Sequence, residues 1–438
     1  MKQRVFSKLD GMKDEAIALL RTLLSFDSVD TPTSDPDAPH GEAVAGCLAA
    51  ALKAAKDYGL STTNLDGEAG LIDSDEGISP KIGMLCHLDV VPAGEGWSHD
   101  PFKGEIEDGK LFGRGTSDDK GPFVCALLAL AAIRACDVPL KYPIRLIAGT
   151  CEETGSADIA YCKERGVIPP YVFSPDANYP VVNTEKGMAR FSVSATLPED
   201  STLSSLFGGE VLNMVPQSAA ATLKDGTILI AEGKSAHAST PELGENAVSA
   251  LFSILCAQLQ SDPAYGILET ARGLHPPHVT DGSPLGIEAS DEISGSLTCS
   301  LGLARLEDGI LTLSFDVRHP LCTSADEIRE KLEARLCSTP FSVTKFQGIA
   351  PHHVDENSPF VQSLLSAYTE VTGLEGYCIA IGGGTYVHDI DGGVAFGTCF
   401  PNQDCRIHSP DEFTPVEDLI LNAKIFAAAL LKLQEQTL

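Results

Sequence analysis

The segment Gly83-Met-Leu-Cys-His87-Leu-Asp89-Val-Val-Pro92 places a histidine and a carboxylate at the end of an otherwise apolar run. The residues from 81 to 88 have the composition of a buried strand. Because side chains alternate along a strand, His87 and Asp89 project to the same side if the backbone stays extended. A carboxylate beside an imidazole fixes its tautomer and raises its basicity, as the partners of metal-bound histidines do. The segment therefore indicates either a metal-ligating histidine or a hydrogen-bonded core histidine.

The bulk composition is that of a soluble globular protein. A chain of 438 residues exceeds one ordinary core, so we expect two domains. Hydrophobic residues make up 43% and charged residues 21% of the chain. There is no cationic leader and no run of 18 apolar residues, so we expect a cytoplasmic protein without a membrane span. The net charge of −30 disfavours nucleic acid and anionic membranes as partners.

The thirteen cysteines are scattered, and no Cys-x-x-Cys occurs. An odd number without a pattern predicts free thiols in a reducing cytoplasm rather than a disulfide framework. Cys86, Cys151 and Cys405 lie near candidate site residues, and thiolates bind zinc well. Each has a better oxygen or nitrogen ligand close by in the sequence, so we expect these sulfurs to point away from the site.

Helical patterns alternate with apolar strands through the first 180 residues. This alternation is typical of an α/β domain with a largely parallel sheet, in which ligands bind outside the carboxyl ends of the strands. His87, Glu152 and Asp176 fall just after predicted strands. We predict helices at 12–26, 121–136 and 156–165, and strands at 81–88, 143–150 and 171–174.

The pattern changes near residue 188 and returns to α/β after 353. Half-exposed strands are predicted at Ala189–Thr196, Ala220–Leu223 and Ile310–Val317, with helices at 245–260 and 324–337. This combination indicates an antiparallel sheet with helices on one face, an α+β domain. The sequence therefore predicts a discontinuous domain, 1–184 and 353–438, into which residues 185–352 are inserted. The second stretch is predicted to hold a helix at 358–372, a strand near 394–399 and a helix at 415–435.

Four further segments carry polar residues at the expected strand ends. Three of them have an ordinary alternative: Asp118 and Asp119 could cap a helix, Glu152 and Glu153 could form a solvated turn, and Asp176 could form an Asx-turn. Together with His87 they suit two divalent ions bridged by one aspartate. One such aspartate, one Glu, one Asp and a bridging hydroxide would carry four negative charges against two M²⁺. The segments are Gly113–Pro122, Glu152-Glu153, Ser174-Pro-Asp176 and Pro401–Pro410, which contains His408.

In order and spacing these segments resemble the co-catalytic metallopeptidases, the family of glutamate carboxypeptidase, aminoacylase, succinyl-diaminopimelate desuccinylase and carnosinase. The resemblance is closest to the dipeptidase V branch, which includes manganese- or zinc-dependent dipeptidases of Gram-positive bacteria. It spans nearly the whole chain. It implies a zinc-exopeptidase-like domain with an inserted, ferredoxin-like lid that carries an extra segment. The phrases of the closer match are His87–Trp97, Gly208–Pro216, Gly382–Tyr386 and Val394–Gly397.

The resemblance implies a role for each residue of the metal centre. Glu152 would be the general base, and Asp89 would orient His87. Asp118 would bridge the two ions, with Asp119 as the less favoured member of the doublet and a cis peptide between them. His87 and Asp176 would complete one site, and Glu153 and His408 the other. The ions would be Zn²⁺, with Mn²⁺ or Co²⁺ as alternatives. The five implied metal ligands are His87, Asp118, Glu153, Asp176 and His408.

The resemblance also implies substrate contacts in and beside the inserted segment. Arg318 would grip the substrate's free carboxylate, although a surface ion pair is an alternative for it. His237 lies in a motif whose histidine helps to stabilise the tetrahedral intermediate in some relatives. In the dipeptidase V branch a histidine of the extra lid segment takes this catalytic role, and either His275 or His278 fits. The implied substrate-binding residues are Asn213, His237, Arg318, Gly383, Gly384 and Thr385.

We therefore expect a metal-dependent dipeptidase acting on unblocked small peptides. A deacylase of N-acyl amino acids would share every ligand, and a non-catalytic binder would lack the base. We also expect a monomer. A four-stranded, two-helix lid needs about 80–100 residues at average element lengths, yet the insertion from 185 to 352 is far longer. We expect the surplus mostly between Ala247 and Leu303, in the place where dimeric relatives use the neighbouring subunit's lid.

Overall fold

The computed structural model describes residues 1–438 and divides into two units. Unit 1 and unit 2 each have a hydrophobic core of their own. Their roles as a catalytic domain and a lid, with boundaries at 184 and 353, stay predictions. Unit 1 comprises Met1–Asn183, Val354–Ile379 and Thr385–Leu438, and unit 2 comprises Thr184–His353 and Ala380–Gly384.

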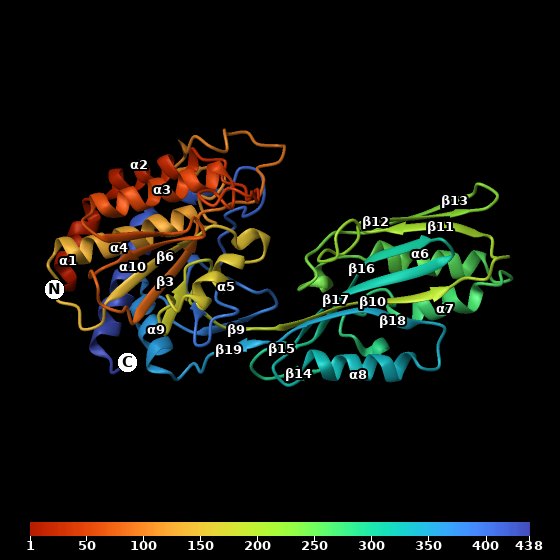
Figure 1. Ribbon diagram of the computed structural model, residues 1–438. Coiled ribbons are helices and arrows are strands. Elements are labelled where there is room, and N and C mark those ends of the chain that lie inside the picture. Colours follow the sequence, from red (N-terminus) through yellow and green to blue (C-terminus); the bar gives the residue numbers. More distant parts are fainter. The chain divides into compact units, whose positions relative to one another are not determined.

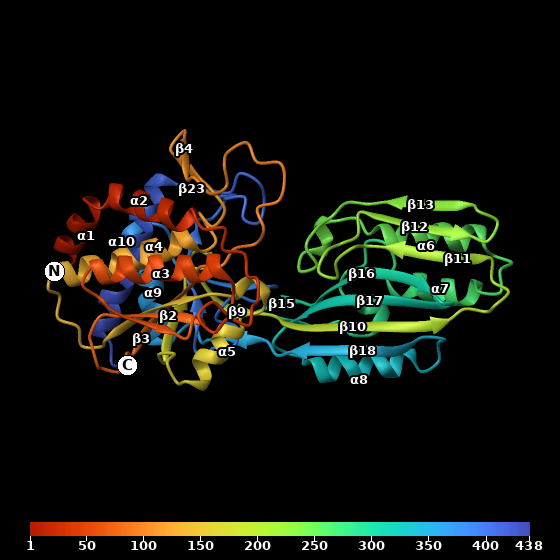
Figure 2. The ribbon, with the colours of Figure 1, turned by 45° about the horizontal axis from the view of Figure 1, so that its top comes forward.

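Unit 1 is built on a mixed sheet whose centre is parallel (Figure 1 and Figure 2). The strands β6, β3, β7 and β21 run parallel to one another, while β1, β2 and β9 add antiparallel edges. The predicted α/β class with a mostly parallel central sheet is confirmed. In sheet order the strands are β1 (Ser61–Leu65), β2 (Ala69–Asp73), β6 (Ile144–Gly149), β3 (Ile82–His87), β7 (Tyr171–Ser174), β21 (Val394–Ala395) and β9 (Val181–Glu185).

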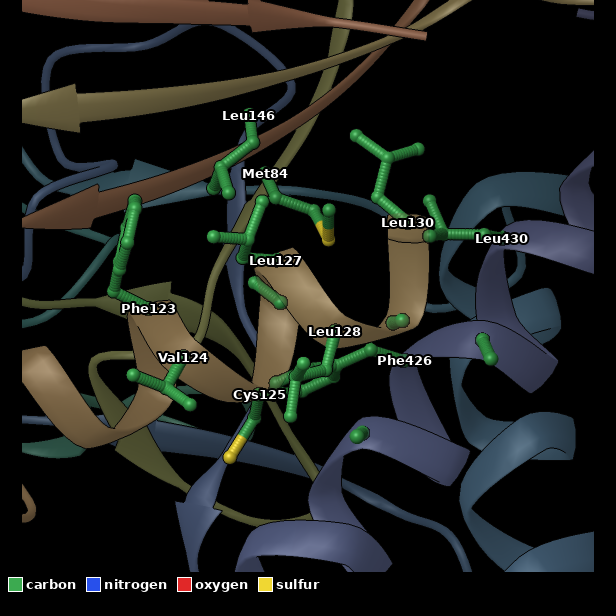
Figure 3. Packing of buried hydrophobic residues seen from close by; sticks show 14 of the residues in the cluster. Met84, Phe123, Val124, Cys125, Leu127, Leu128, Leu130, Leu146, Phe426 and Leu430 are labelled. Atoms are coloured by element: carbon green, nitrogen blue, oxygen red, sulfur yellow. The ribbon is translucent and has the colours of Figure 1, made fainter. Parts of the chain in front are cut away.

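Helix α4 (Lys120–Ala135) forms the centre of the unit 1 core. Its residues from Lys120 to Ile133 are all buried, as expected of a helix that is apolar on every side. Figure 3 shows Leu127 beside Met84 of β3, and Leu128 beside Phe426 of α10 (Val416–Glu435). Full burial of one such side chain contributes about 1.5–3 kcal/mol. Helix α4 thus packs against β3 and α10, and the main-chain N–H of His87 at the end of β3 donates to Asp119 just before the helix.

The remaining helices of unit 1 flank this core. The sequence patterns predicted α2, α5 and α9 but missed α1 and α3. Helix α3 contacts β1 and β2, and α1 contacts α4 and α10. No helix of the protein combines the length and the apolarity that a membrane crossing requires. The bounds are α1 (Lys2–Asp10), α2 (Lys13–Leu24), α3 (Glu42–Asp57), α5 (Ala157–Glu164) and α9 (Pro359–Thr372).

Short strands connect the site loops of unit 1. Strands β4, β5 and β23 form a small antiparallel sheet, and β8 pairs in parallel with β22. Strand β20 pairs with β9. These strands are β4 (Glu105–Glu107), β5 (Lys110–Phe112), β8 (Ala177–Asn178), β20 (Cys378–Ile381), β22 (Thr398–Cys399) and β23 (Phe413–Pro415).

Unit 2 is a seven-stranded antiparallel sheet with its helices packed on one face. Alternate residues of β10, such as Phe191 and Val193, are buried together with residues of the helices α6 (Ala247–Gln258), α7 (Tyr265–Leu274) and α8 (Ala325–Leu336). On the other face hydroxyls pair across strands, as Ser192 does with Ser314 at 2.8 Å. The α+β prediction is confirmed. The strands in sheet order are β13 (Ile228–Glu232), β12 (Ser218–Leu223), β11 (Leu203–Gly208), β16 (Thr298–Glu307), β17 (Ile310–His319), β10 (Gly187–Thr196) and β18 (Ser342–Ile349).

The ferredoxin-like core of unit 2 consists of β10, α6 (Ala247–Gln258), β16, β17, α8 (Ala325–Leu336) and β18. The surplus was expected mostly between Ala247 and Leu303, and this expectation was only half right. Helix α7 (Tyr265–Leu274) and the hairpin β14–β15 (Ser290–Asp291, Gly295–Ser296) lie there. The strands β11, β12 and β13 lie before it. They extend the sheet because β11 pairs with the edge of β16.

Candidate metal centre and substrate-binding residues

The candidate metal centre forms at the carboxyl ends of three neighbouring strands of unit 1. Strand β3 ends at His87, β6 leads into the turn that carries Glu152 and Glu153, and β7 ends two residues before Asp176. Because β3 runs parallel to both β6 and β7, these ends meet at one edge of the sheet. The side chains that follow these three strands in the sequence therefore lie close together in space.

Asp118 is at the centre of this cluster. Its Oδ1 lies 2.9 Å from His87 Nε2, and its Oδ2 lies 2.9 Å from His408 Nε2. His408 Nε2 is also 3.0 Å from Glu153 Oε1, and His87 Nε2 is 3.9 Å from Asp176 Oδ2. Two groups of three potential ligands result, each with ligand atoms within 4.8 Å of one another, and both contain Asp118. The structure thus brings all five predicted metal ligands together, with the predicted bridging residue common to both groups.

A third group combines His87 with the adjacent Glu152 and Glu153. It shows that the predicted base lies within reach of the predicted ligands. None of the groups contains a cysteine. The thirteen cysteines are free thiols, and Cys151 Sγ accepts a hydrogen bond from the Asp158 main-chain N–H at 3.3 Å.

Asp119 has a different environment from Asp118. Its Oδ2 accepts a hydrogen bond from the main-chain N–H of His87 at 3.0 Å, and its Oδ1 has no partner. It belongs to none of the three groups of potential ligands. The peptide between Asp118 and Asp119 is cis, as the resemblance implied. Asp119 therefore binds the main chain at the end of β3, the strand that carries His87. This leaves Asp118 as the better candidate for the bridge between the two ions.

Asp89 has two partners where the sequence predicted one. Its carboxylate lies 3.3 Å from His87 Nδ1, the contact expected of a residue that orients the imidazole. It also accepts hydrogen bonds from the main-chain N–H groups of Glu152 at 3.1 Å and Glu153 at 3.0 Å. One fully buried carboxylate thus fixes both the histidine and the turn that carries the predicted base.

The charges of the cluster fit two divalent cations. Burial, followed by the charges of Glu153 and Asp118, raises the pKa of Glu152 to about 7. Burial and the Asp118 charge raise the pKa of Asp176 well above its usual range. The carboxylates of Asp118, Glu153 and Asp176 form their ion pairs with His87 and His408, so negative charge is in surplus. Carboxylate oxygens and imidazole nitrogens are a donor set that suits zinc, manganese and cobalt.

A glycine allows the Asp118 loop to lie close against α4. A Cβ atom at Gly121 would lie only 2.0 Å from the carbonyl oxygen of Thr116. The main-chain N–H of Gly121 donates to the carbonyl of Gly115 at 3.1 Å. Packing therefore requires a glycine at position 121, because a side chain there would push the loop away from the helix.

Predicted substrate-binding residues of unit 2 converge around Arg318. Arg318 is 3% exposed, and its Nε lies 2.6 Å from Asp316 Oδ1. Its Nη1 donates to the carbonyl oxygen of Gly382 at 2.9 Å. The ion pair considered as the alternative for Arg318 thus exists. It is a buried pair that orients the guanidinium, not a surface one, and it leaves Arg318 next to the predicted glycine loop.

Asn213 and His237 lie in the same part of unit 2. The Asn213 carbonyl accepts the main-chain N–H of Ala238 at 2.8 Å. His237 Nδ1 lies 2.7 Å from the hydroxyl of Ser239, and a Cβ at Gly382 would meet the Ser239 Cβ at 2.8 Å. Burial and the Arg318 charge lower the pKa of His237. Gly383 and Gly384 follow in the same loop, whereas Thr385 belongs to unit 1.

The structure distinguishes the two candidate catalytic histidines of the extra segment. His275 is 4% exposed, with Nδ1 2.8 Å from the Ser249 hydroxyl and Nε2 3.3 Å from the Cys299 carbonyl. Burial lowers its pKa to about 4. His275 is therefore placed as a hydrogen-bonded core histidine. His278 has an exposed side chain and lines the same small cavity of about 90 Å³.

Comparisons with known proteins agree with this fold. Residues 83–432 match the family described as Peptidase family M20/M25/M40. The chain is 31% identical to the Beta-Ala-Xaa dipeptidase of Lactobacillus delbrueckii subsp. lactis, over 97% of each chain. It is 33% identical to YtjP of Bacillus subtilis (strain 168), over 96% of this chain and 97% of that protein. Human carnosine dipeptidase 1 shares the fold, with a TM-score of 0.63 at 17% identity over 99% of each chain.

The chain belongs to the M20/M25/M40 peptidase family. It is a peptide hydrolase of that family, and the resemblance predicted from its motifs is confirmed.

The geometry predicts different results for the two adjacent aspartates. Asp118→Ala removes the residue shared by both groups of ligands, so we expect the purified protein to lose both metal ions. Asp119→Ala removes no ligand, so we expect it to retain more metal. Metal content by plasma emission spectrometry after dialysis checks this. Greater loss in Asp119→Ala would reverse the assignment within the doublet.

Proposed function

We propose that this protein is a metal-dependent dipeptidase that hydrolyses the peptide bond of unblocked dipeptides. The observation that carries the proposal is the pair of ligand groups that share Asp118, with Glu152 beside them. The similarity to a Beta-Ala-Xaa dipeptidase over 97% of both chains supports the dipeptide as the substrate class.

Two divalent cations, held by His87, Asp118, Glu153, Asp176 and His408, would polarise the scissile carbonyl and make water a better nucleophile. Glu152 accepts the proton of the attacking water and then delivers it to the leaving amine. Burial and the neighbouring charges raise the pKa of Glu152 to about 7. These surroundings therefore favour transfer of a proton to the Glu152 carboxylate. Asp89 keeps Glu152 in place, because it binds the main-chain N–H of the Glu152 turn.

We assign the recognition of the substrate's C-terminal carboxylate to Arg318. A guanidinium binds a carboxylate through two parallel hydrogen bonds, and Asp316 and Gly382 already fix the orientation of this one. Asn213, His237, Gly383, Gly384 and Thr385 complete the proposed substrate contacts. Of the two lid histidines we favour His278 for contact with the reaction intermediate, because the ring nitrogens of His275 are occupied.

We propose Zn²⁺ as the native ion, with Mn²⁺ or Co²⁺ as alternatives, because the donor set suits all three. The thirteen free thiols favour a reducing cytoplasm as the location.

A substrate panel tests the proposed function. We expect metal-loaded protein to hydrolyse free dipeptides such as β-alanyl dipeptides, with N-acetyl amino acids at least tenfold poorer, and a chelator to abolish turnover. Glu152→Gln is the matched control. It keeps the shape of the side chain but cannot accept a proton, a loss of about 10²–10⁴-fold in kcat, with two ions still bound. Preferential turnover of N-acetyl amino acids would instead make the protein a deacylase, and full activity of Glu152→Gln would exclude Glu152 as the base.

Arg318 allows a test of substrate recognition. Arg318→Ala removes the partner of the C-terminal carboxylate, so kcat/KM for a free dipeptide should fall by at least about 10²-fold, in line with the strength of charge-assisted hydrogen bonds. The corresponding dipeptide amide lacks this carboxylate and should lose much less. Equal losses for both substrates, measured side by side, would remove Arg318 from carboxylate binding.

We propose that the enzyme is a monomer. The support for this is that β11, β12 and β13 of the same chain continue the sheet past β16, the edge strand of the ferredoxin-like core, so this edge is not free to pair with a second subunit. Light scattering on active, metal-loaded protein should give a mass near the 46.2 kDa of one chain. A mass of about twice that value would contradict this proposal.

A further inference from the structure

Glu412 is a buried carboxylate four residues after the predicted ligand His408, and it has no assigned role. It is 0% exposed. Its Oε1 accepts the main-chain N–H of Ser117 at 2.9 Å and of Asp118 at 3.3 Å. Both of its oxygens lie 3.2 Å from the main-chain nitrogen of Gly115. The carboxylate therefore binds the backbone of the loop that ends in Asp118.

The surroundings of Glu412 supply hydrogen-bond donors to both oxygens. Arg114, itself 1% exposed, places Nη1 2.6 Å from Oε2, and the Thr116 hydroxyl lies 3.4 Å from Oε1. An ionised carboxylate accepts such bonds at both oxygens, whereas a protonated one would present a donor to other donors. A buried charge of this kind is tolerated because it is paired and fully hydrogen-bonded.

Further contacts join the same two segments. The main-chain N–H of Gly113 donates to the Glu412 carbonyl at 2.9 Å, and the Ser117 hydroxyl donates to the Phe413 carbonyl at 2.8 Å. Strands β5 and β23 continue the connection as an antiparallel pair. Glu412 and Asp118 are 294 positions apart in the sequence. The chain thus uses one side chain to join the loop of Asp118 to the segment of His408.

We infer that Glu412 is a positioning residue of the metal centre, which sets the main chain of Asp118 relative to His408. These two residues provide ligand atoms that lie 2.9 Å apart, and both belong to one ligand group. Glu412 is not a member of any such group, so it acts through Asp118 and His408. This inference rests on the proposed metal centre. It adds Glu412 as the residue that holds the ligands Asp118 and His408 in place before a metal ion binds.

Glu412→Gln is the sharpest variant, because it changes one oxygen to an NH₂ group and little else. Either orientation of the amide turns a donor toward the N–H groups of the loop or toward Arg114, so the loop must shift. Partners outside the ligand shell typically change metal affinity by about 10–100-fold. We expect that loss for the metal ion bound by Asp118 and His408. Glu417→Gln is the matched control, with the same chemical change at an exposed position five residues later.

The test is a titration of metal-free protein with Co²⁺, followed by visible absorption and by competition with a chelator. We expect Glu412→Gln to bind at least one Co²⁺ about 10–100-fold more weakly, with an altered absorption spectrum, while circular dichroism matches the wild type. Glu417→Gln should match the wild type in affinity and spectrum. A change in the Co²⁺ spectrum reports a change in the geometry of the metal ligands. A general loss of protein stability would leave the spectrum of the bound ion unchanged.

The outcomes separate this inference from the proposed function. Wild-type protein that binds no Co²⁺ would overturn both. Wild-type protein that binds two ions, with Glu412→Gln equal to it in affinity and spectrum, would overturn the inference alone. If Glu412→Gln does not fold, Glu412→Asp and Glu417→Asp replace the pair, and the shorter carboxylate at 412 should still weaken Co²⁺ binding. Failure of both variants at 412 to fold would make Glu412 a determinant of folding and overturn its positioning role.

Discussion

Confinement of like charges at one edge of the unit 1 sheet is the constraint on which the rest of this structure depends. Asp118, Glu152, Glu153 and Asp176 lie together, with only the imidazoles of His87 and His408 as ion-pair partners among them. Carboxylates in such surroundings repel one another strongly, because little water screens them. The backbone must therefore be held by other interactions. The parallel strands, the buried helix α4 and the fully hydrogen-bonded Asp89 and Glu412 provide them.

The sequence predicted the elements whose patterns are local. Strands β3, β6 and β7 and the helices α4 and α10 are continuous apolar or periodic segments, and the structure contains each within a few residues of its predicted bounds. Helix α3 was missed although its buried residues Val44, Cys47, Leu48, Ala51, Leu52 and Ala55 repeat at helical spacing. That signal could have been found. The pairing of β11 with β16 could not, because it joins segments about 100 residues apart.

For the candidate site, too, residues with a local sequence pattern were predicted, and contacts between distant segments were not. His87, the acidic pair 152–153 and Asp176 follow strand ends, so a parallel sheet was enough to bring them together. The burial of His275 depends on Ser249 and Cys299, which lie on other elements, and no local pattern reveals them. The second role of Asp89 depends on the turn at Glu152. The candidate metal ligands were thus visible in the sequence, whereas the residues that hold these candidates in place could be found only from the fold.

The segments that form the candidate metal centre are far apart in the sequence, so the centre is complete only when both are folded against each other. Glu412 lies beyond the whole of the main unit 2 segment, Thr184–His353, yet its carboxylate binds the loop at 115–118. Contacts of such separation carry a cost of loop closure that local contacts avoid. A chain that lacked the docked segment around Glu412 would have His87 and Asp176 at their strand ends but neither His408 nor an anchored Asp118. The proposed two-ion site therefore needs both the segment that carries Asp118 and the segment that carries His408, and ions that bind there would stabilise the folded chain over the unfolded one.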